Sequence, residues 1–290
     1  ANPAGEWHDE LSKFGSLTAL SEDPFAFHLG LMEFAEVSDK RDMLINAIRE
    51  NLYVRCHFAY GLIVVADEAR RMGLDRIAVI EFGVWKGRGL KNLASLALLV
   101  HDCTGVSFDV YGFDTGAGMP PAVDWRDHPE LWEAGQMAMP DYIALRDELP
   151  GNCTLIIGPI EETIEDFCIT RMNANAPLGF ISFDMDYYSS TVQSLRVMEN
   201  QADHYLPAMT IWVDDSYISI MQTHFAGEAL ALREFNDTHE LRKFDYKRIR
   251  PNQPPMLWHN GVWFCHIFDH PMRNGSAPTG NFNKFFMTEF

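Results

Sequence analysis

The stretch IAVIEFGVWKGRG, residues 77–89, decides the fold. Its apolar first half is bounded by charged residues before it and by glycines after it, a pattern typical of a buried parallel strand. Gly83, Gly87 and Gly89 permit positive φ angles and close backbone approach, so the loop after the strand can wrap around a ligand. A helix predicted over residues 88–101 would point its N-terminal amides at that ligand. The stretch therefore predicts a strand, a binding loop and a helix.

The spacing of the loop is Glu81-x-Gly83-x-x-x-Gly87. It differs from the G-x-G-x-x-G pattern in which glycines make room for a dinucleotide pyrophosphate, and it lacks the G-K-[ST] of a phosphate-binding loop. An ordinary strand-turn-helix, with glycines used only for close packing, remains an alternative reading of this motif on its own.

Composition and charge limit the function classes. The 290 residues are 47% hydrophobic and 22% charged, which is typical of one large globular domain or one domain with a cap. The formal net charge of −18 argues against nucleic acid or an anionic membrane surface as partner, because both require a basic face. Neutral or cationic substrates, or a divalent metal, fit better. Five cysteines without a C-x-x-C pair, and no apolar run of ~20 residues, indicate a cytoplasmic protein with free thiols.

The chain divides into a helical arm, a main domain and a tail, with predicted bounds of 1–72, 73–270 and 271–290. Seven strands are predicted at residues 77–82, 107–113, 154–157, 178–183, 209–213, 241–249 and 262–268. Between them, helices are predicted at 88–101, 161–172, 189–201 and 224–235. Residues 115–150 are too long for an ordinary connection and indicate an inserted lid.

Acidic side chains stand at the ends of several predicted strands: Glu81, Asp114, Asp184 with Asp186, and Asp214 with Asp215. In an open parallel sheet, ligands bind beyond the carboxyl ends of the strands, so these groups should share one rim. Carboxylates at such short range repel one another unless a proton or cation neutralises them, and oxygen ligands favour Mg²⁺. Alternatively, Asp184 caps a helix and Asp214 belongs to a polar turn.

Five segments together resemble the ordered motifs of the macrocin O-methyltransferase family: EFGVWKG (81–87), YGFDTGAGMP (111–120), GPIEET (158–163), FDMDYYSST (183–191) and WVDDSY (212–217). That family uses S-adenosylmethionine (SAM) and Mg²⁺ to methylate sugar hydroxyls of macrolide antibiotics. The likeness spans roughly residues 75–240. Two positions depart from the family pattern: Met185 replaces a glycine and Ser216 replaces a tyrosine.

The resemblance implies an α/β class I methyltransferase fold, Rossmann-like, with a seven-stranded sheet, mostly parallel with one antiparallel strand, and helices on both faces. It implies SAM-binding roles for Glu81, Gly83, Val84, Gly87, Asp114, Asp184 and Glu161, the last or Glu162 near the adenine. It implies metal-ligand roles for Asp186, Asp214 and Asp215. The expected partner is a small-molecule acceptor, such as a sugar or natural-product diol, and the chain is a candidate homo-oligomer.

An acceptor hydroxyl is a poor nucleophile until it is deprotonated or polarised, so the site needs a base. Asp184 and Asp186 are the preferred candidates because both lie beside the expected metal, and His224 is a further candidate. Two other functions remain open. A NAD(P)-dependent oxidoreductase would share the strand-loop-helix, although the missing G-x-G-x-x-G argues against it. A SAM-binding protein without catalysis is the other.

Overall fold

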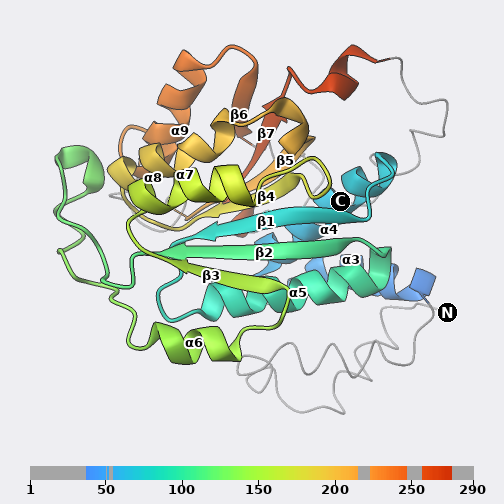
Figure 1. The fold of residues 1–290 in the computed structure, drawn as a ribbon, viewed down its shortest axis with the longest axis horizontal. Coiled ribbons are helices and arrows are strands. Elements are labelled where there is room, and N and C mark those ends of the chain that lie inside the picture. Colours follow the sequence, from blue (N-terminus) through green and yellow to red (C-terminus); the bar gives the residue numbers. More distant parts are fainter. Residues whose placement is uncertain (1–36, 50, 52–54, 215–222, 247–256, 276–290) are drawn as a thin grey trace.

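The structure is a computed structural model, and it describes residues 37–49, 51, 55–214, 223–246 and 257–275. The described strands form one seven-stranded sheet in the order β3-β2-β1-β4-β5-β7-β6 (Figure 1). Their bounds are β1 Arg76–Phe82, β2 Ser107–Asp114, β3 Cys153–Ile157, β4 Leu178–Phe183, β5 Tyr205–Val213, β6 Arg242–Tyr246 and β7 Val262–Ile267. Strand β7 runs antiparallel to β5 and β6, and the other pairs are parallel. The predicted fold class is confirmed.

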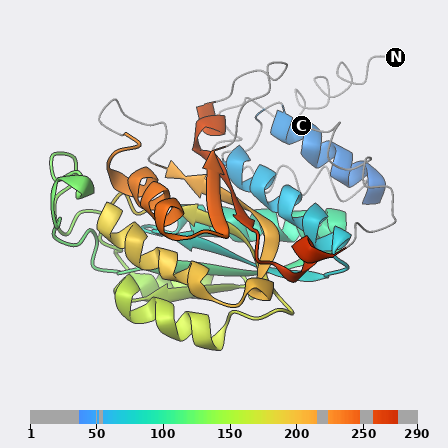
Figure 2. The same cartoon turned by 90° about the horizontal axis from the view of Figure 1, so that it is seen from above.

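Helices cover both faces of the sheet. Their bounds are α3 Val37–Arg49, α4 Cys56–Arg71, α5 Arg88–Thr104, α6 Tyr142–Glu148, α7 Ile160–Thr170, α8 Tyr188–Ser194 and α9 Gly227–Thr238. Helices α3, α4 and α5 lie on one face, and α7, α8 and α9 lie on the other (Figures 1 and 2). No described helix is both long enough and apolar enough to cross a bilayer. The sheet is therefore enclosed on its two faces, and its carboxyl edge is where a ligand can enter.

Strand order reverses beside β1, which pairs with β2 on one side and β4 on the other. The predicted strand at residues 77–82 matches β1, whose residues after Arg76 are all buried. Gly87 is the left-handed N-cap of α5, with φ of 79°. A Cβ there would lie 2.3 Å from Leu145 of α6, so glycine allows the start of α5 to pack against the insertion.

Helix α4 lies directly on the centre of the sheet. A Cβ on Gly61 would lie 2.5 Å from the ring of Phe180 in β4, so the helix approaches more closely than an alanine would allow. Nearer its N-terminus, His57 stacks on Trp212 of β5 with ring centroids 3.7 Å apart. Because Trp212 is the penultimate residue of β5, this stack places the start of α4 at the carboxyl edge of the sheet.

Among the predicted elements whose bounds differ from the structure, two differ for identifiable physical reasons. The helix predicted over 189–201 is α8 followed by a 3-10 helix, Leu195–Glu199, because the Tyr205 hydroxyl ties this segment by donating to Val197 O at 2.8 Å and accepting from Asn200 N at 2.7 Å. Strand β5 begins at Tyr205 rather than at residue 209, and its register with β4 shifts after that first pair. The shifted part contains Pro207, which cannot donate a ladder hydrogen bond.

Candidate functional site

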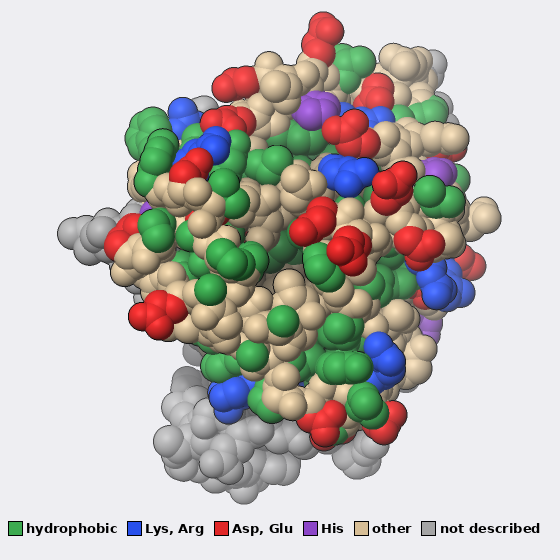
Figure 3. Space-filling model, turned by 60° about the vertical axis from the view of Figure 1, so that its left-hand side comes forward, with side chains coloured by type: hydrophobic (Ala, Val, Ile, Leu, Met, Phe, Trp, Pro, Cys, Tyr) green, Lys and Arg blue, Asp and Glu red, His purple; other side chains and the backbone are tan. Residues whose placement is uncertain are grey.

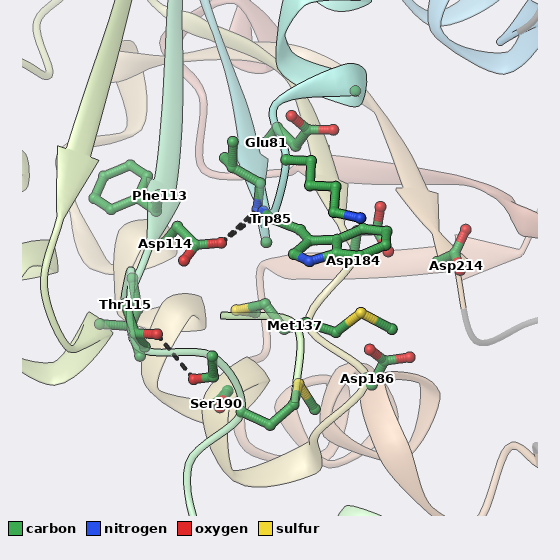
Figure 4. A pocket seen from close by; sticks show the side chains of 18 of the residues that line it. Glu81, Trp85, Phe113, Asp114, Thr115, Met137, Asp184, Asp186, Ser190 and Asp214 are labelled. Atoms are coloured by element: carbon green, nitrogen blue, oxygen red, sulfur yellow. Dashed lines mark hydrogen bonds between the residues drawn. The ribbon is translucent and has the colours of Figure 1, made fainter. Parts of the chain in front are cut away.

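A cavity of about 440 Å³ opens at the carboxyl edge of the sheet. Its walls come from the β1–α5 loop, the ends of β2, β4 and β5, the insertion 115–150 and the residue before α4. In Figure 4, Asp184, Asp186 and Asp214 lie on one side of the cavity, and Phe113 and Asp114 lie on the other. The predicted convergence of acidic side chains at one rim is therefore present for the described residues.

The loop after β1 needs glycine at its first position. Gly83 has φ of 86°, and a Cβ there would lie 1.8 Å from the carbonyl oxygen of Asp184. No side chain fits at that distance, so the loop can pass the end of β4 only as glycine. The amides of Val84 and Trp85 donate to Asp114 Oδ2 at 3.0 and 2.8 Å (Figure 4). Asp114 thus holds this loop in place from the neighbouring strand.

Asp114 also organises the chain that follows β2. Its Oδ1 accepts a hydrogen bond from Gly116 N at 2.6 Å, while its Oδ2 is taken by the two loop amides. A carboxylate offers about four lone-pair positions, so one position on Oδ1 remains for a ligand hydroxyl. The predicted ribose contact is compatible with this geometry and stays a prediction.

Glu81 is the buried acid of the site. Its side chain is 1% exposed, and its Oε2 has no hydrogen-bond partner in the described part of the chain. Burial raises the pKa of this carboxyl well above its usual value, Arg55 opposes that shift, and Asp184, Asp114 and Asp214 add to it. A Cβ on Gly89 would lie 1.9 Å from Glu81 Oε1, so glycine in the first turn of α5 makes room for the acid. An uncompensated buried carboxylate of this kind favours a cationic ligand group.

Asp184 and Asp214 follow neighbouring strands at the same level, because Phe183 pairs with Val213 in the parallel register of β4 and β5. The predicted adjacency of these strands is confirmed. Trp212 Nε1 donates to Asp214 Oδ1 at 3.3 Å, and the guanidinium of Arg55 lies 3.9 Å from Asp184 Oδ2. Each acid thus already has a polar neighbour at the rim.

The turn between Asp184 and α8 is fixed from α9. The buried carboxylate Glu228 accepts hydrogen bonds from Met185 N at 2.7 Å and Asp186 N at 3.3 Å. Asp186 has φ of 61°, a left-handed conformation that aspartate and asparagine adopt more readily than most residues other than glycine. The local preference of aspartate and the hydrogen bonds to Glu228 therefore favour the same turn.

The described residues include some, but not all, of the predicted metal ligands. Asp184, Asp186 and Asp214 line one cavity, and their oxygens are the donors that Mg²⁺ prefers. Among the described residues, however, no three acidic, histidine or cysteine side chains are grouped closely enough to hold a metal ion. Asp215 lies outside the described residues, as does Ser216. The donor chemistry fits a divalent cation, and the ligand set stays a prediction.

The insertion 115–150 is held down onto α8. Asp127, which is fully buried, accepts hydrogen bonds from Ser189 N at 2.8 Å, Ser189 Oγ at 2.9 Å and Val123 N at 2.8 Å. The guanidinium of Arg126 lies over the ring of Tyr188, 4.2 Å from its centroid. Met119, Trp132 and Met137 from the same insertion line the cavity. The insertion therefore forms one wall of the site in this conformation.

Three predicted site residues do not line the cavity: Gly87, Glu161 and His224. The helix that begins at Ile160 exposes Glu161 to solvent, so Gly158 and Ile160 border the cavity instead. The His224 side chain is exposed and sits near Tyr246 and Trp263, with ring centroids 6.2 and 5.9 Å away. His224 therefore lies outside the cavity lining, and its predicted role as base stays a prediction.

Sequence reasoning missed Arg55, Lys86 and Trp85 as cavity residues. Lys86 Nζ lies over the Trp85 ring, 4.3 Å from its centroid, and Trp85 adopts a positive φ of 47°. A bulky residue with positive φ is strained and often belongs to a ligand site, but only the structure reveals the angle. Figure 3 shows acidic side chains spread over this side of the molecule with several basic ones among them.

No family model matches the chain, and no curated protein sequence matches it. Solved structures do resemble it. The calicheamicin methyltransferase CalS11 shares 18% identity, with 87% of this chain and 96% of that chain covered and a TM-score of 0.47. The O-methyltransferase NovP shares 14% identity, with 73% and 80% covered and a TM-score of 0.46. MycE from the mycinamycin biosynthetic pathway, in complex with Mg and S-adenosylhomocysteine (SAH), shares 13%, with 73% and 51% covered and a TM-score of 0.33. At these values the matches do not establish an activity.

Proposed function

We propose that this protein is a SAM-dependent O-methyltransferase that acts on a hydroxyl group of a small molecule with the help of a divalent metal. One observation supports this most directly: the Gly83 loop, the Asp114 carboxylate and the aspartates after β4 and β5 border a single cavity at the carboxyl edge. Ligands of open α/β sheets bind at this edge, beside the point where strand order reverses.

The residues present fit the cofactor. The Gly83 loop leaves a space that any Cβ would fill, and the unpartnered Oε2 of buried Glu81 borders the same cavity. When bound, SAM would supply a positively charged sulfonium whose methyl group is open to attack. Glu81 offers negative charge to the cationic ligand, and the remaining position on Asp114 Oδ1 accepts a ribose hydroxyl. The charges of Glu81 and Asp114 thus complement the positive charge of SAM.

The acceptor would lie between the cofactor and the aspartates. Asp184 or Asp186 takes the proton of the acceptor hydroxyl, since both line the cavity and an ionised carboxylate is an acceptor. A divalent cation would lower the pKa of that hydroxyl, and Asp186, Asp214 and Asp215 would hold it. The acceptor class, a sugar or natural-product diol, rests on the resemblance of the five sequence motifs to the macrocin O-methyltransferase family. Trp132, Met119 and Met137 provide an apolar wall for it.

Ligand-dependent thermal unfolding separates this function from an oxidoreductase. A ligand at a hundred times its dissociation constant stabilises the folded protein by ~2.7 kcal/mol, so SAH should raise the unfolding temperature and NADH or NADPH should not. Stabilisation by a nicotinamide cofactor alone would overturn the proposal. Mass spectrometry of reactions with SAM and candidate diols should then show the gain of one methyl group. Tight SAH binding without transfer to any hydroxyl acceptor would instead favour a SAM-binding protein that does not catalyse.

A further inference from the structure

Arg55 is a cation that the packing of α4 brings to the cavity. It is the residue before α4, and the stack of His57 on Trp212 holds this end of the helix at the carboxyl edge. Its side chain is 27% exposed and borders the cavity together with Glu81, Gly83 and Asp184. A partly buried guanidinium at a ligand cavity is a candidate for anion recognition.

The position of the Arg55 guanidinium is restricted by its neighbours, but its N–H donors are available for a ligand. Its central carbon lies 5.1 Å from the centroid of the Phe58 ring, and its Nη1 lies 3.9 Å from Asp184 Oδ2. The latter distance is too long for a hydrogen bond, and the guanidinium donates none to the residues that the structure describes. Its five N–H donors therefore remain for a ligand, while the ring and the nearby carboxylate restrict its position.

Opposite charges border the same region of the cavity. Glu81 contributes a buried carboxylate whose Oε2 has no partner among the described residues, and Arg55 lines the same cavity and opposes the upward shift of the Glu81 pKa. A positive and a negative group in one cavity match a zwitterion, whose ammonium and carboxylate groups are separated by a single carbon. The planar guanidinium suits a carboxylate because it can donate two parallel hydrogen bonds.

Two other cations line the cavity, and both are less suited. Lys86 sits over the Trp85 ring at 4.3 Å, so its ammonium is already engaged. Arg88 lies in the first turn of α5 and its side chain is exposed. Arg55, by contrast, forms an ion pair with Asp184. It is also the cation whose charge acts on the buried acid Glu81.

We propose that Arg55 binds the α-carboxylate of the amino-acid portion of the cofactor, with Glu81 on the side of the α-ammonium group. The proposal rests on the proposed SAM-dependent function. It adds a binding residue from the helix that precedes the first strand, outside the five sequence motifs.

The test compares two probes by calorimetry: SAH, which has the amino-acid portion, and 5′-methylthioadenosine, which lacks it. Arg55→Gln should weaken SAH binding about 10-fold or more and leave methylthioadenosine binding within about 2-fold, because only SAH presents a carboxylate. Arg146→Gln is the matched control, since it makes the same change at an exposed arginine of the insertion that does not line the cavity, and it should change neither affinity by more than about 2-fold. Arg55→Lys should recover part of the SAH affinity.

Retained methylthioadenosine binding shows that the variant is folded around the cavity. Equal weakening of both probes in Arg55→Gln, or equal effects of the Arg55 and Arg146 variants on SAH, would overturn the assignment of Arg55. Unchanged SAH affinity in Arg55→Gln would overturn it while the proposed function stands. Wild-type protein that binds neither probe would overturn the proposed function and this proposal with it.

Discussion

Removing the buried carboxylate of Asp127 should open the insertion 115–150. Asp127 is fully buried and accepts three hydrogen bonds, two of them from Ser189 at the start of α8. Asp127→Ala leaves those three donors without an acceptor. The two Ser189 donors are only partly buried, so each costs ~1–2 kcal/mol when it loses its partner, and Val123 is exposed, so water can replace the third bond. The closed conformation should therefore lose ~2–4 kcal/mol relative to the open one.

Native-state proteolysis measures this change directly. A loss of ~2–4 kcal/mol raises the population of the open insertion by about 30-fold to several hundred-fold, and cleavage follows that population when the insertion recloses quickly. Cuts should fall between residues 115 and 150, whereas the sheet should stay intact. In the wild-type protein, SAH and an acceptor should slow the same cuts, as expected for a lid that closes over its ligands.

Glu133→Ala is the matched control for this prediction. Glu133 lies in the same insertion, its side chain is exposed, and it makes no hydrogen bond to the described residues through its carboxylate. Its removal should leave the cleavage rate within about 2-fold, because exposed charges contribute little. If Asp127→Ala is cut no faster than Glu133→Ala, or if the new cuts lie outside the insertion, then Asp127 does not hold the insertion closed.

Four further results are expected. Gly89→Ala should destabilise the fold by ~1–3 kcal/mol in urea unfolding, because its Cβ would lie 1.9 Å from Glu81 Oε1, while Gly151→Ala, with open space around it, should not. The folded-state pKa of Glu81 is raised, so wild-type stability should fall as pH rises from 4.5 through that pKa, and Glu81→Gln should remove this dependence. A pH profile with the same slope in both proteins would contradict it. His224→Ala should keep kcat within about 2-fold, since His224 does not line the cavity, and a loss of activity would restore it as a candidate base. EDTA should abolish methyl transfer and Mg²⁺ restore it, with Asp214→Asn needing more Mg²⁺, whereas full activity in metal-free protein would remove the metal from the proposal.

Local pattern was sufficient to predict the sheet and the adjacency of the acidic strand ends. The apolar run and the glycines around Gly83 predicted β1 and its loop. The carboxyl ends of parallel strands lie at one edge of a sheet, so the sequence alone also predicted that Asp184 lies beside Asp214. Arg55 could not be found in this way. In the sequence, Arg55 is a single basic residue before an apolar helix. It reaches the cavity because Gly61 allows that helix to pack closely on Phe180, a residue that is distant from Arg55 in the sequence.

Other residues have tertiary contacts that the sequence did not predict. Gly87 was predicted to bind the cofactor, which stays a prediction, and the structure shows that it also makes room for Leu145 of the insertion. Gly89 was predicted to allow close backbone approach so that the loop can wrap around a ligand, and the structure shows that it makes room for the Glu81 carboxylate. His224 was chosen for its closeness in sequence to Asp214 and Asp215, but its side chain does not line the cavity. The contacts of these residues depend on distances between side chains of different helices and strands, and the spacing of residues in the sequence does not predict those distances.

Trp212 connects the cavity at the carboxyl edge to the packing of α4. One face of its indole stacks on His57, and its Nε1 donates to Asp214 Oδ1. Burial, and then the charge of Arg55, hold the His57 pKa well below its usual value, so the imidazole stays uncharged and the stack does not loosen as pH falls toward 6.5. In any redesign of this cavity, α4 and the end of β5 must therefore be treated together. A substitution on the face of α4 that packs against the sheet would displace Trp212 and, with it, the Asp214 side chain. Variant libraries of the cavity should therefore keep His57 and Trp212 unchanged.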